Sequence, residues 1–166
     1  MSATVVHVVR HAKAGDRERW SGPDILRPLT PAGRRQAERL VAMFADAPLT
    51  SLVSGPFLRC VQTLEPLSRA RDLPIEEAFD LAEGRGFELL EKIVLDLANV
   101  GPAVVCVHGD VQQELIEDLL DRGVSLRGGG PVQFKKASSW ALEVRQGLVR
   151  AARYFPPPSG SKSPPH

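Results

Sequence analysis

The sequence predicts an α/β fold in which a mainly parallel sheet is flanked by helices on both faces, as a three-layer sandwich. Two observations support this prediction. First, short continuous apolar runs such as Ala103–Val107 are typical of strands that a parallel sheet buries on both faces. Second, segments with apolar residues at helical spacing separate these runs, and strands that alternate with helices are typical of parallel sheets.

Composition limits the class of protein. The 166 residues suffice for one domain with a sizeable core; we expect it over 1–155, followed by a disordered Pro/Ser-rich tail over 156–166. The formal net charge of +1 offers no general attraction for nucleic acid or a membrane surface. No run approaches the ~20 apolar residues of a membrane span, and the N-terminus lacks a signal peptide's basic region. We therefore expect a cytoplasmic protein in which Cys60 and Cys106 are free thiols.

The first part of the chain predicts two strands separated by a long loop and a helix. A strand is expected over Val5–Val9, followed by a polar loop over Lys13–Pro28, whose length is typical of a functional or disordered segment. Thr30 is a good N-cap residue for a helix that begins with a proline and runs to about residue 45. A second buried strand is expected over Leu49–Ser54.

The middle of the chain predicts two helices around a weak strand. Gly55-Pro56 opens a helix with an apolar face. Leu73–Ile75 is a weaker strand signal, and the apolar spacing over Gly84–Asn99 predicts the next helix.

The last part predicts a buried strand, a helix and a hairpin. The strand is Ala103–Val107, and Asp110 is the expected cap of the helix that follows it. Trp140–Val144 alternates apolar and small polar residues, and Leu148–Tyr154 is its expected hairpin partner.

Three other features receive a structural interpretation. His7, in the middle of the first strand, is expected to be a core or strand-edge histidine whose polar atoms are satisfied. Gly128–Gly130 is expected to be a mobile loop, because it lacks the Lys-Ser/Thr of a phosphate-binding loop. Lys135-Lys136 is expected to be the solvated start of a strand.

Ionisable residues follow three of the predicted strands. Arg10-His11 ends the first, Arg59 lies in the first turn of the helix after the second, and His108 follows Ala103–Val107. Parallel strands bring such residues to one edge of the sheet, where open α/β sheets bind ligands and helix N-termini favour anions. Two histidines and two arginines around one anion-sized space suit phosphoryl transfer, which needs an in-line nucleophile and cations on the phosphoryl oxygens.

These motifs, taken in order, resemble the histidine phosphatase superfamily, the phosphoglycerate mutase-like enzymes. In its compact length the chain is similar to the SixA-type branch of this superfamily, the phosphohistidine phosphatases. One stretch also resembles the phosphatase half of actinobacterial MutT-type Nudix–phosphatase fusions, although the sequence has no Nudix box. The resemblance covers roughly 5–154 and implies a phosphoglycerate mutase-like fold. The segments that carry it are 9–12, 54–63 and 107–109 for the superfamily, 27–33 for the SixA-type branch, and 20–24 with 59–60 for the fusions.

The resemblance also implies roles for single residues. His11 would be the nucleophile that forms a phosphohistidine intermediate. Three other residues would bind the phosphoryl group and stabilise its transition state: Arg10, Arg59 and His108. No metal-ligand spacing is present in the sequence, so we expect a metal-independent enzyme without a cofactor.

Five further residues are candidates around this site. Glu83 stands where larger members place the acid that protonates the leaving group; it could equally be a solvated loop acid or helix cap, and Asp110 is the alternative acid. Lys13 and Arg27 either hold ion pairs within the long loop or face the substrate. Trp20 either caps the core or stacks on a base at the pocket mouth.

The sequence thus predicts a phosphohydrolase that removes a phosphoryl group from a small phosphorylated metabolite or nucleotide. Two alternatives stay open: a protein phosphohistidine phosphatase of the SixA type, and a non-catalytic phosphate-binding module. The leaving group, the oligomeric state and any cooperation with a separate Nudix hydrolase are not determined by the sequence.

Overall fold

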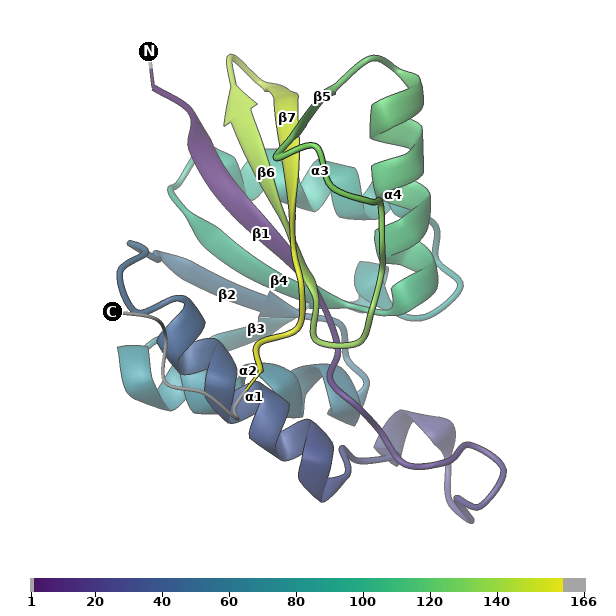
Figure 1. Ribbon diagram of the computed structural model, residues 1–166. Coiled ribbons are helices and arrows are strands. Elements are labelled where there is room, and N and C mark those ends of the chain that lie inside the picture. Colours follow the sequence, from purple (N-terminus) through teal and green to yellow (C-terminus); the bar gives the residue numbers. More distant parts are fainter. Residues whose placement is uncertain (1, 160–166) are drawn as a thin grey trace.

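The computed structural model describes residues 2–159. A seven-stranded sheet in the order β3-β2-β4-β1-β6-β7-β5 lies between two layers of helices (Figure 1). The elements, in chain order, are β1 (Thr4–Arg10), the 3-10 helix η1 (Asp24–Leu26), α1 (Pro31–Met43), β2 (Ser51–Ser54), α2 (Leu58–Arg71), β3 (Ile75–Glu77), the 3-10 helix η2 (Phe79–Leu81), α3 (Phe87–Ala98), β4 (Ala103–Val107), α4 (Gly109–Asp121), β5 (Ser125–Arg127), β6 (Ser139–Arg145) and β7 (Leu148–Phe155).

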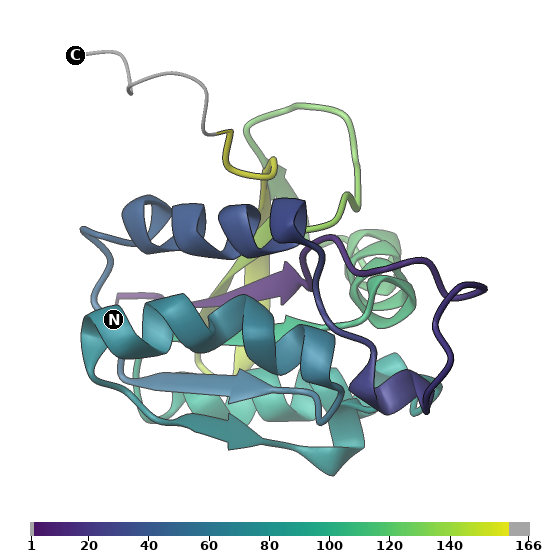
Figure 2. The ribbon, with the colours of Figure 1, turned by 90° about the horizontal axis from the view of Figure 1, so that it is seen from below.

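The sheet is mainly parallel, which confirms the predicted fold class. β3, β2, β4 and β1 pair in parallel, and β5 pairs in parallel with β7. β6 is antiparallel to both of its neighbours, β1 and β7, as expected of the hairpin. The carboxyl ends of β1, β2 and β4 therefore lie at one edge of the sheet, where the long segment 13–28 projects from the body (Figures 1 and 2).

Two apolar clusters hold the layers together. Successive residues of a strand point to opposite faces, so Val8 packs with α3 and α4 while Val9 packs with α1 and α2. Figure 2 shows these helix pairs on the two faces. The central strand β4 is buried along its whole length, as the continuous apolar run predicts.

Local chemistry explains how α1 begins. The Thr30 hydroxyl accepts a hydrogen bond from Gly33 N at 3.0 Å, and Pro31 occupies the first helical position, which confirms the predicted cap. A Cβ atom at Gly33 would overlap the carbonyl of Lys13. Glycine at this position therefore lets the start of α1 pack closely against the segment that follows β1.

Several predicted boundaries are wrong. α3 begins at Phe87 because Gly84 and Gly86 have φ of 84° and 94°, which a right-handed helix does not accommodate. α4 begins at Gly109 with His108 as its N-cap, so Asp110 lies inside the first turn, where its Oδ1 accepts from Val111 N.

Other differences concern short elements. The weak strand signal at Leu73–Ile75 corresponds to β3 at Ile75–Glu77. The long polar loop contains η1 and a bridge between Ala14 and Leu29. β5 was not predicted, because a three-residue edge strand has no recognisable period.

Two further predictions concern His7 and the tail. His7 is largely buried, with its ring edge against Phe44 at 4.8 Å between centroids, yet its Nδ1 has no hydrogen-bond partner in the described part of the chain. The expectation that its polar atoms are satisfied is thus wrong for Nδ1. Residues 156–159 have no regular structure, and the rest of the predicted tail, 160–166, lies outside the described residues. Between residues 2 and 159, no helix has the length and apolarity to cross a membrane.

Candidate active site

The strands and helices bring the predicted site residues to one cavity. His11 follows the end of β1, His108 follows the end of β4, and Arg59 lies in the first turn of α2. The cavity has a volume of about 450 Å³. It is lined by Arg10, His11, Ala14, Gly15, Asp16, Arg17, Arg27, Arg59, Glu83, His108, Gly109, Asp110 and Lys136.

His11 is held as a neutral imidazole with one nitrogen free. Its Nδ1 lies 2.8 Å from the carbonyl oxygen of Ala12, and because a carbonyl only accepts, Nδ1 carries the proton and donates it. The pKa of His11 is lowered to about 3, chiefly by burial; the hydrogen bond to Ala12 acts to raise it, and the positive charges of Arg59, His108 and Arg10 act to lower it. The Nε2 lone pair is therefore available for nucleophilic attack at neutral pH.

Two guanidinium groups each keep a buried N–H without a partner. The Arg10 Nη1 donates to the carbonyl of Phe134 at 2.6 Å, which fixes the guanidinium at the end of β1. Within residues 2–159, both Arg10 Nε and Arg59 Nε are buried and lack a hydrogen-bond partner. An unpaired buried N–H costs free energy, so these two groups are donors prepared for oxygen atoms of a ligand.

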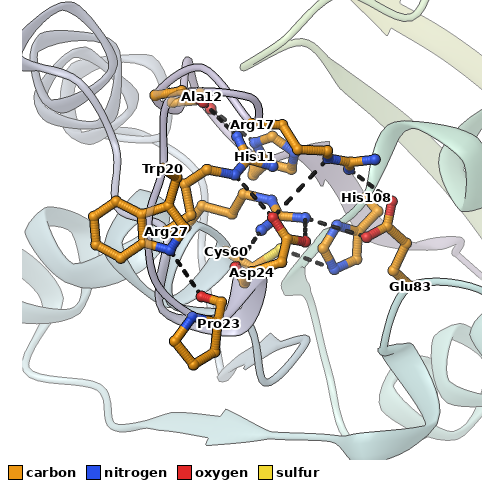
Figure 3. A network of polar contacts seen from close by, with 12 residues as sticks. His11, Ala12, Arg17, Trp20, Pro23, Asp24, Arg27, Cys60, Glu83 and His108 are labelled. Atoms are coloured by element: carbon orange, nitrogen blue, oxygen red, sulfur yellow. Dashed lines mark hydrogen bonds and ion pairs between the residues drawn. The ribbon is translucent and has the colours of Figure 1, made fainter.

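Asp24 forms the centre of an ion-pair network on one wall of the site. Its Oδ2 accepts from Arg59 Nη2 at 3.1 Å, its Oδ1 accepts from Arg27 Nε at 2.9 Å, and its backbone oxygen accepts from Arg59 Nη1. Burial raises the pKa of Asp24, but hydrogen bonds and positive charge from Arg27 and Arg59 outweigh this and hold that pKa below its ordinary value. Figure 3 shows the network around Asp24, with Arg27 on one side and Glu83 on the other.

Glu83 completes this network. Its Oε2 accepts from Arg59 Nη2 at 3.3 Å and its Oε1 accepts from Arg17 Nη2 at 3.2 Å. The carboxylates of Asp24 and Glu83 thus share the guanidinium of Arg59, whose side chain is 1% exposed. This arrangement orients Arg59 while leaving its Nε free.

His108 is positioned by packing. Its ring meets the edge of Phe57 at 4.8 Å and the ring of His11 at 5.7 Å between centroids. Its Nε2 lies 3.9 Å from the sulfur of Cys60, which, like Cys106, is a buried free thiol, as predicted. The two imidazoles therefore occupy neighbouring positions on the cavity floor.

The loop that carries His11 is tied to α2. The Thr63 hydroxyl accepts from Ala12 N at 2.9 Å and donates to the Arg59 carbonyl at 2.7 Å. Gln62 Oε1 accepts from Leu29 N at 2.9 Å. These bonds set the distance between the β1 loop and the start of α2.

The structure brings most of the predicted site residues together, but Lys13 and Trp20 are outside the cavity lining. The backbone N–H of Lys13 donates to Gln36 Oε1, and the indole N–H of Trp20 donates to the carbonyl of Pro23. Trp20 is 37% exposed and so does not cap the core. Arg27 is 7% exposed and lines the cavity.

Two residues of the site were missed. Lys136 lines the cavity, and Asp24 holds Arg59 and Arg27. Arg17, from the long polar loop 13–28, also lines the cavity. The three-residue spacing of Asp24 and Arg27 was a usable signal, because oppositely charged residues at this spacing pair in a helical turn. Lys136 stands in no motif, so sequence alone offered no signal for it.

No metal site is formed by the described residues. Across residues 2–159, no group of three or more His, Cys, Asp or Glu side chains is placed to hold a metal ion. The positive charge in the cavity comes from arginine and lysine side chains.

The sequence is similar to that of a mycobacterial phosphatase. The chain is 37% identical over 158 residues to an 8-oxo-(d)GTP phosphatase of Mycolicibacterium smegmatis, a match that covers 92% of this chain and 48% of that protein. The chain thus spans about half the length of this relative.

Solved structures share the fold. The structure of the protein histidine phosphatase SixA complexed with tungstate has a TM-score of 0.72 at 20% identity, covering 91% of this chain and 94% of that one. A phosphohistidine phosphatase SixA from Agrobacterium tumefaciens, described as putative, has a TM-score of 0.74 at 21% identity, covering 92% and 96% of the two chains.

A family model matches more than half of the chain. The matched residues, 6–92, include the end of β1 with Arg10 and His11, the start of α2 with Arg59, and the loop with Glu83. The matching model is that of the histidine phosphatase superfamily, branch 1. This chain therefore belongs to the histidine phosphatase superfamily.

Proposed function

We propose that this chain is a phosphohydrolase that removes a phosphoryl group from a small phosphorylated molecule through a phosphohistidine intermediate on His11. The observation that carries the proposal is the pairing of a neutral imidazole with two unpartnered buried donors. The free Nε2 of His11 and the Nε groups of Arg10 and Arg59 share one cavity. Transfer of a phosphoryl group needs both a nucleophile in line with the leaving group and hydrogen-bond donors on the equatorial oxygens.

The reaction proceeds in two steps. His11 Nε2 attacks phosphorus, so that an N–P bond forms while the bond from phosphorus to the leaving oxygen breaks. Water then attacks the phosphohistidine, releasing orthophosphate and restoring the imidazole. Arg10, Arg59 and His108 stabilise the charge on the phosphoryl oxygens in both steps.

Two carboxyl groups are candidates for protonating the leaving oxygen. Glu83 and Asp110 both line the cavity. Glu83 is tied to two arginines, whereas within residues 2–159 the Asp110 carboxylate accepts a hydrogen bond only from the backbone N–H of Val111. The acid matters most for a poor leaving group. Glu83→Gln and Asp110→Asn should therefore be compared on an alkyl phosphate and on p-nitrophenyl phosphate, and the acid is the residue whose loss slows the alkyl ester more.

The name of the mycobacterial relative supports a nucleotide as substrate, because that protein is an 8-oxo-(d)GTP phosphatase. The second candidate is phosphohistidine on a protein, supported by the similarity in fold and compact length to SixA. A phosphate-release screen with nucleotides, sugar phosphates and a phosphohistidine protein separates the two.

The central experiment is turnover of p-nitrophenyl phosphate by the wild type and by His11→Ala, with and without EDTA. We expect turnover by the wild type, none by the variant, and no effect of the chelator, because the cations in the proposed mechanism are side chains. His7→Gln, which removes a histidine outside the cavity, is the matched control. Absence of wild-type turnover across mild pH would favour a non-catalytic phosphate-binding module.

The proposed phosphohistidine intermediate can be detected directly. Rapid denaturation during turnover of a radiolabelled substrate should leave acid-labile, alkali-stable label on the protein, as expected of phosphohistidine. Turnover without such label would contradict the covalent route while leaving the phosphatase assignment intact.

A further inference from the structure

Lys136 is a cation of the cavity that the proposed mechanism does not use. It lies on the rim, in the loop between β5 and β6, and lines the cavity together with Arg10 and Arg27. Its neighbour Ala137 donates from its backbone N–H to the carbonyls of Arg10 and His11, at 3.0 and 3.2 Å. The loop that carries Lys136 is thus fastened to the nucleophile's own strand end.

The charge of Lys136 is not balanced by a neighbour. Five cationic side chains line the cavity against three carboxylates. Glu83 bonds Arg17 and Arg59, and Asp24 bonds Arg27, whereas no hydrogen bond or ion pair joins the Lys136 ammonium to any residue between 2 and 159.

Other cations surround Lys136. Partial burial lowers the pKa of its ammonium, and the positive charges of Arg10, Lys13 and Arg27 lower the pKa further. Like charges held together in this way repel one another unless an anion lies between them. The rim therefore has an excess of positive charge beside His11, Arg59 and His108, and it shares Arg10 with the residues that would hold the transferred phosphoryl group.

We propose that Lys136, with Arg27 and Arg10, forms a second phosphate subsite, and that the enzyme favours substrates whose terminal phosphoryl group is attached to another phosphate. This inference rests on the proposed function, because it places the transferred group at His11. Arg27 Nε and Nη1 are engaged by Asp24 and Gly15, which leaves Nη2 as its donor for a ligand.

The lining also indicates what the site does not select. No Phe, Tyr or Trp is found among the cavity residues of the described chain, and its small residues are Ala14, Gly15 and Gly109. The described lining thus offers cations for phosphate oxygens and no aromatic ring on which a base would stack. With the charges of Lys136 and Arg27, this fits an organic diphosphate or longer phosphate chain as the substrate class.

The chemistry of such a substrate fits the subsite. His11 Nε2 bonds to the terminal phosphorus, and the bond from that phosphorus to the bridging oxygen breaks, so that the remaining phosphate departs with the bonding electron pair. Lys136 and Arg27 then face the charge that develops on the departing phosphate. Water completes the cycle by hydrolysing the phosphohistidine, and the net reaction consumes one water and releases orthophosphate.

The test uses inorganic pyrophosphate and orthophosphate as probes, titrated by calorimetry into the His11→Ala protein so that neither is consumed. We expect pyrophosphate to bind about tenfold more tightly than orthophosphate. Adding Lys136→Gln should reduce this preference about fivefold, as expected for one solvent-screened charge pair. Adding Lys135→Gln should leave this preference unchanged, because Lys135 is also exposed but does not line the cavity.

Kinetics supply the second readout. In proteins that retain His11, Lys136→Gln should lower kcat/KM for a nucleoside diphosphate more than for the matching monophosphate. Equal affinity for the two inorganic anions, or an equal loss of both in Lys136→Gln, would overturn the subsite while leaving p-nitrophenyl phosphate turnover as support for the phosphatase itself. Conversely, a pyrophosphate preference in a protein that hydrolyses nothing would uphold the subsite and overturn the proposed function.

Discussion

Thr63 links the loop that carries His11, the proposed nucleophile, to the start of α2 through one hydroxyl group, which accepts from Ala12 N and donates to the Arg59 carbonyl. Thr63→Val keeps the shape and removes both bonds, so the buried Ala12 N–H loses its partner at a cost of about 1–3 kcal/mol. We expect a lower free energy of unfolding in urea and a lower kcat with p-nitrophenyl phosphate. Thr63→Ser, which keeps the hydroxyl, should restore most of both. A valine variant equal to the wild type in both measurements would show that the loop is held elsewhere.

Asp24 would compete with a phosphate bound as proposed above for the same guanidinium groups. Its carboxylate bonds Arg59 and Arg27. Asp24→Asn removes the negative charge, so we expect orthophosphate to inhibit about threefold more strongly, while the Tm falls because two buried arginines lose their counter-charge.

The control for Asp24→Asn removes one negative charge away from the cavity. Asp80→Asn loses a surface pair with Arg85 and should change neither orthophosphate inhibition nor Tm appreciably. Weaker orthophosphate inhibition in Asp24→Asn would instead mean that Asp24 mainly positions the arginines.

Single residues of the site were predictable where a motif named them. His11, Arg59 and His108 each follow a buried strand, and the topology of parallel strands placed them together. Asp24 and Lys136 were not identified because their role depends on how two irregular segments fold back toward the cavity, which no short-range pattern in the sequence describes.

At the level of elements, the start of α4 depends on a glycine that makes room for Arg10. A Cβ atom at Gly109 would lie 2.5 Å from Arg10 Nε and 2.6 Å from its Cζ. Gly109→Ala should therefore displace the guanidinium from the phosphoryl position, lowering kcat/KM about 100-fold with little change in Tm. Gly130→Ala is the matched control, because nothing lies within 4 Å of the added Cβ. Equal activity of the two variants would show that Arg10 tolerates displacement.

Elements with a strong hydrophobic periodicity were predicted from the sequence, whereas short elements held by tertiary contacts were not. α1 has both an N-cap and an apolar stripe, and its start at Pro31 was predicted correctly. η1 and β5 are three residues each, and their conformations depend on bonds to distant residues, such as Asp24 with Arg59 and Leu126 with Ala152. Such elements have no local signature that sequence reasoning could use.

The arrangement of the whole molecule follows from β4 and β1 at the centre of the sheet. Both faces of β4 are covered, so its run of apolar residues predicted a parallel sheet with helices on both sides. The strand order was beyond sequence reasoning, since pairing of β2 with β4 rather than β1 is decided by the packing of whole layers. Yet the meeting of His11, Arg59 and His108 at the candidate site depends only on the shared direction of these strands, which is why this juxtaposition was easier to predict than the topology.

The stability of the whole domain should depend on pH through its buried histidines. Burial lowers the pKa of His7 from 6.5 to about 4. As the pH falls from 6.5 toward 4, the unfolded chain binds a proton at this residue that the folded chain does not bind. The free energy of unfolding is therefore highest above pH 6.5 and falls as the pH is lowered, with His7 contributing about 2 kcal/mol of the loss between pH 7 and 5.

His7→Gln separates this contribution from that of His11, whose depressed pKa acts in the same direction. Urea unfolding of the wild type and of the variant at pH 7, 6 and 5 measures the difference. The variant should lose less stability over this range, and its curve should approach that of the wild type at pH 5, because glutamine has no proton to gain when the chain unfolds. Parallel curves for the two proteins would mean that His7 is protonated in the folded state over this range.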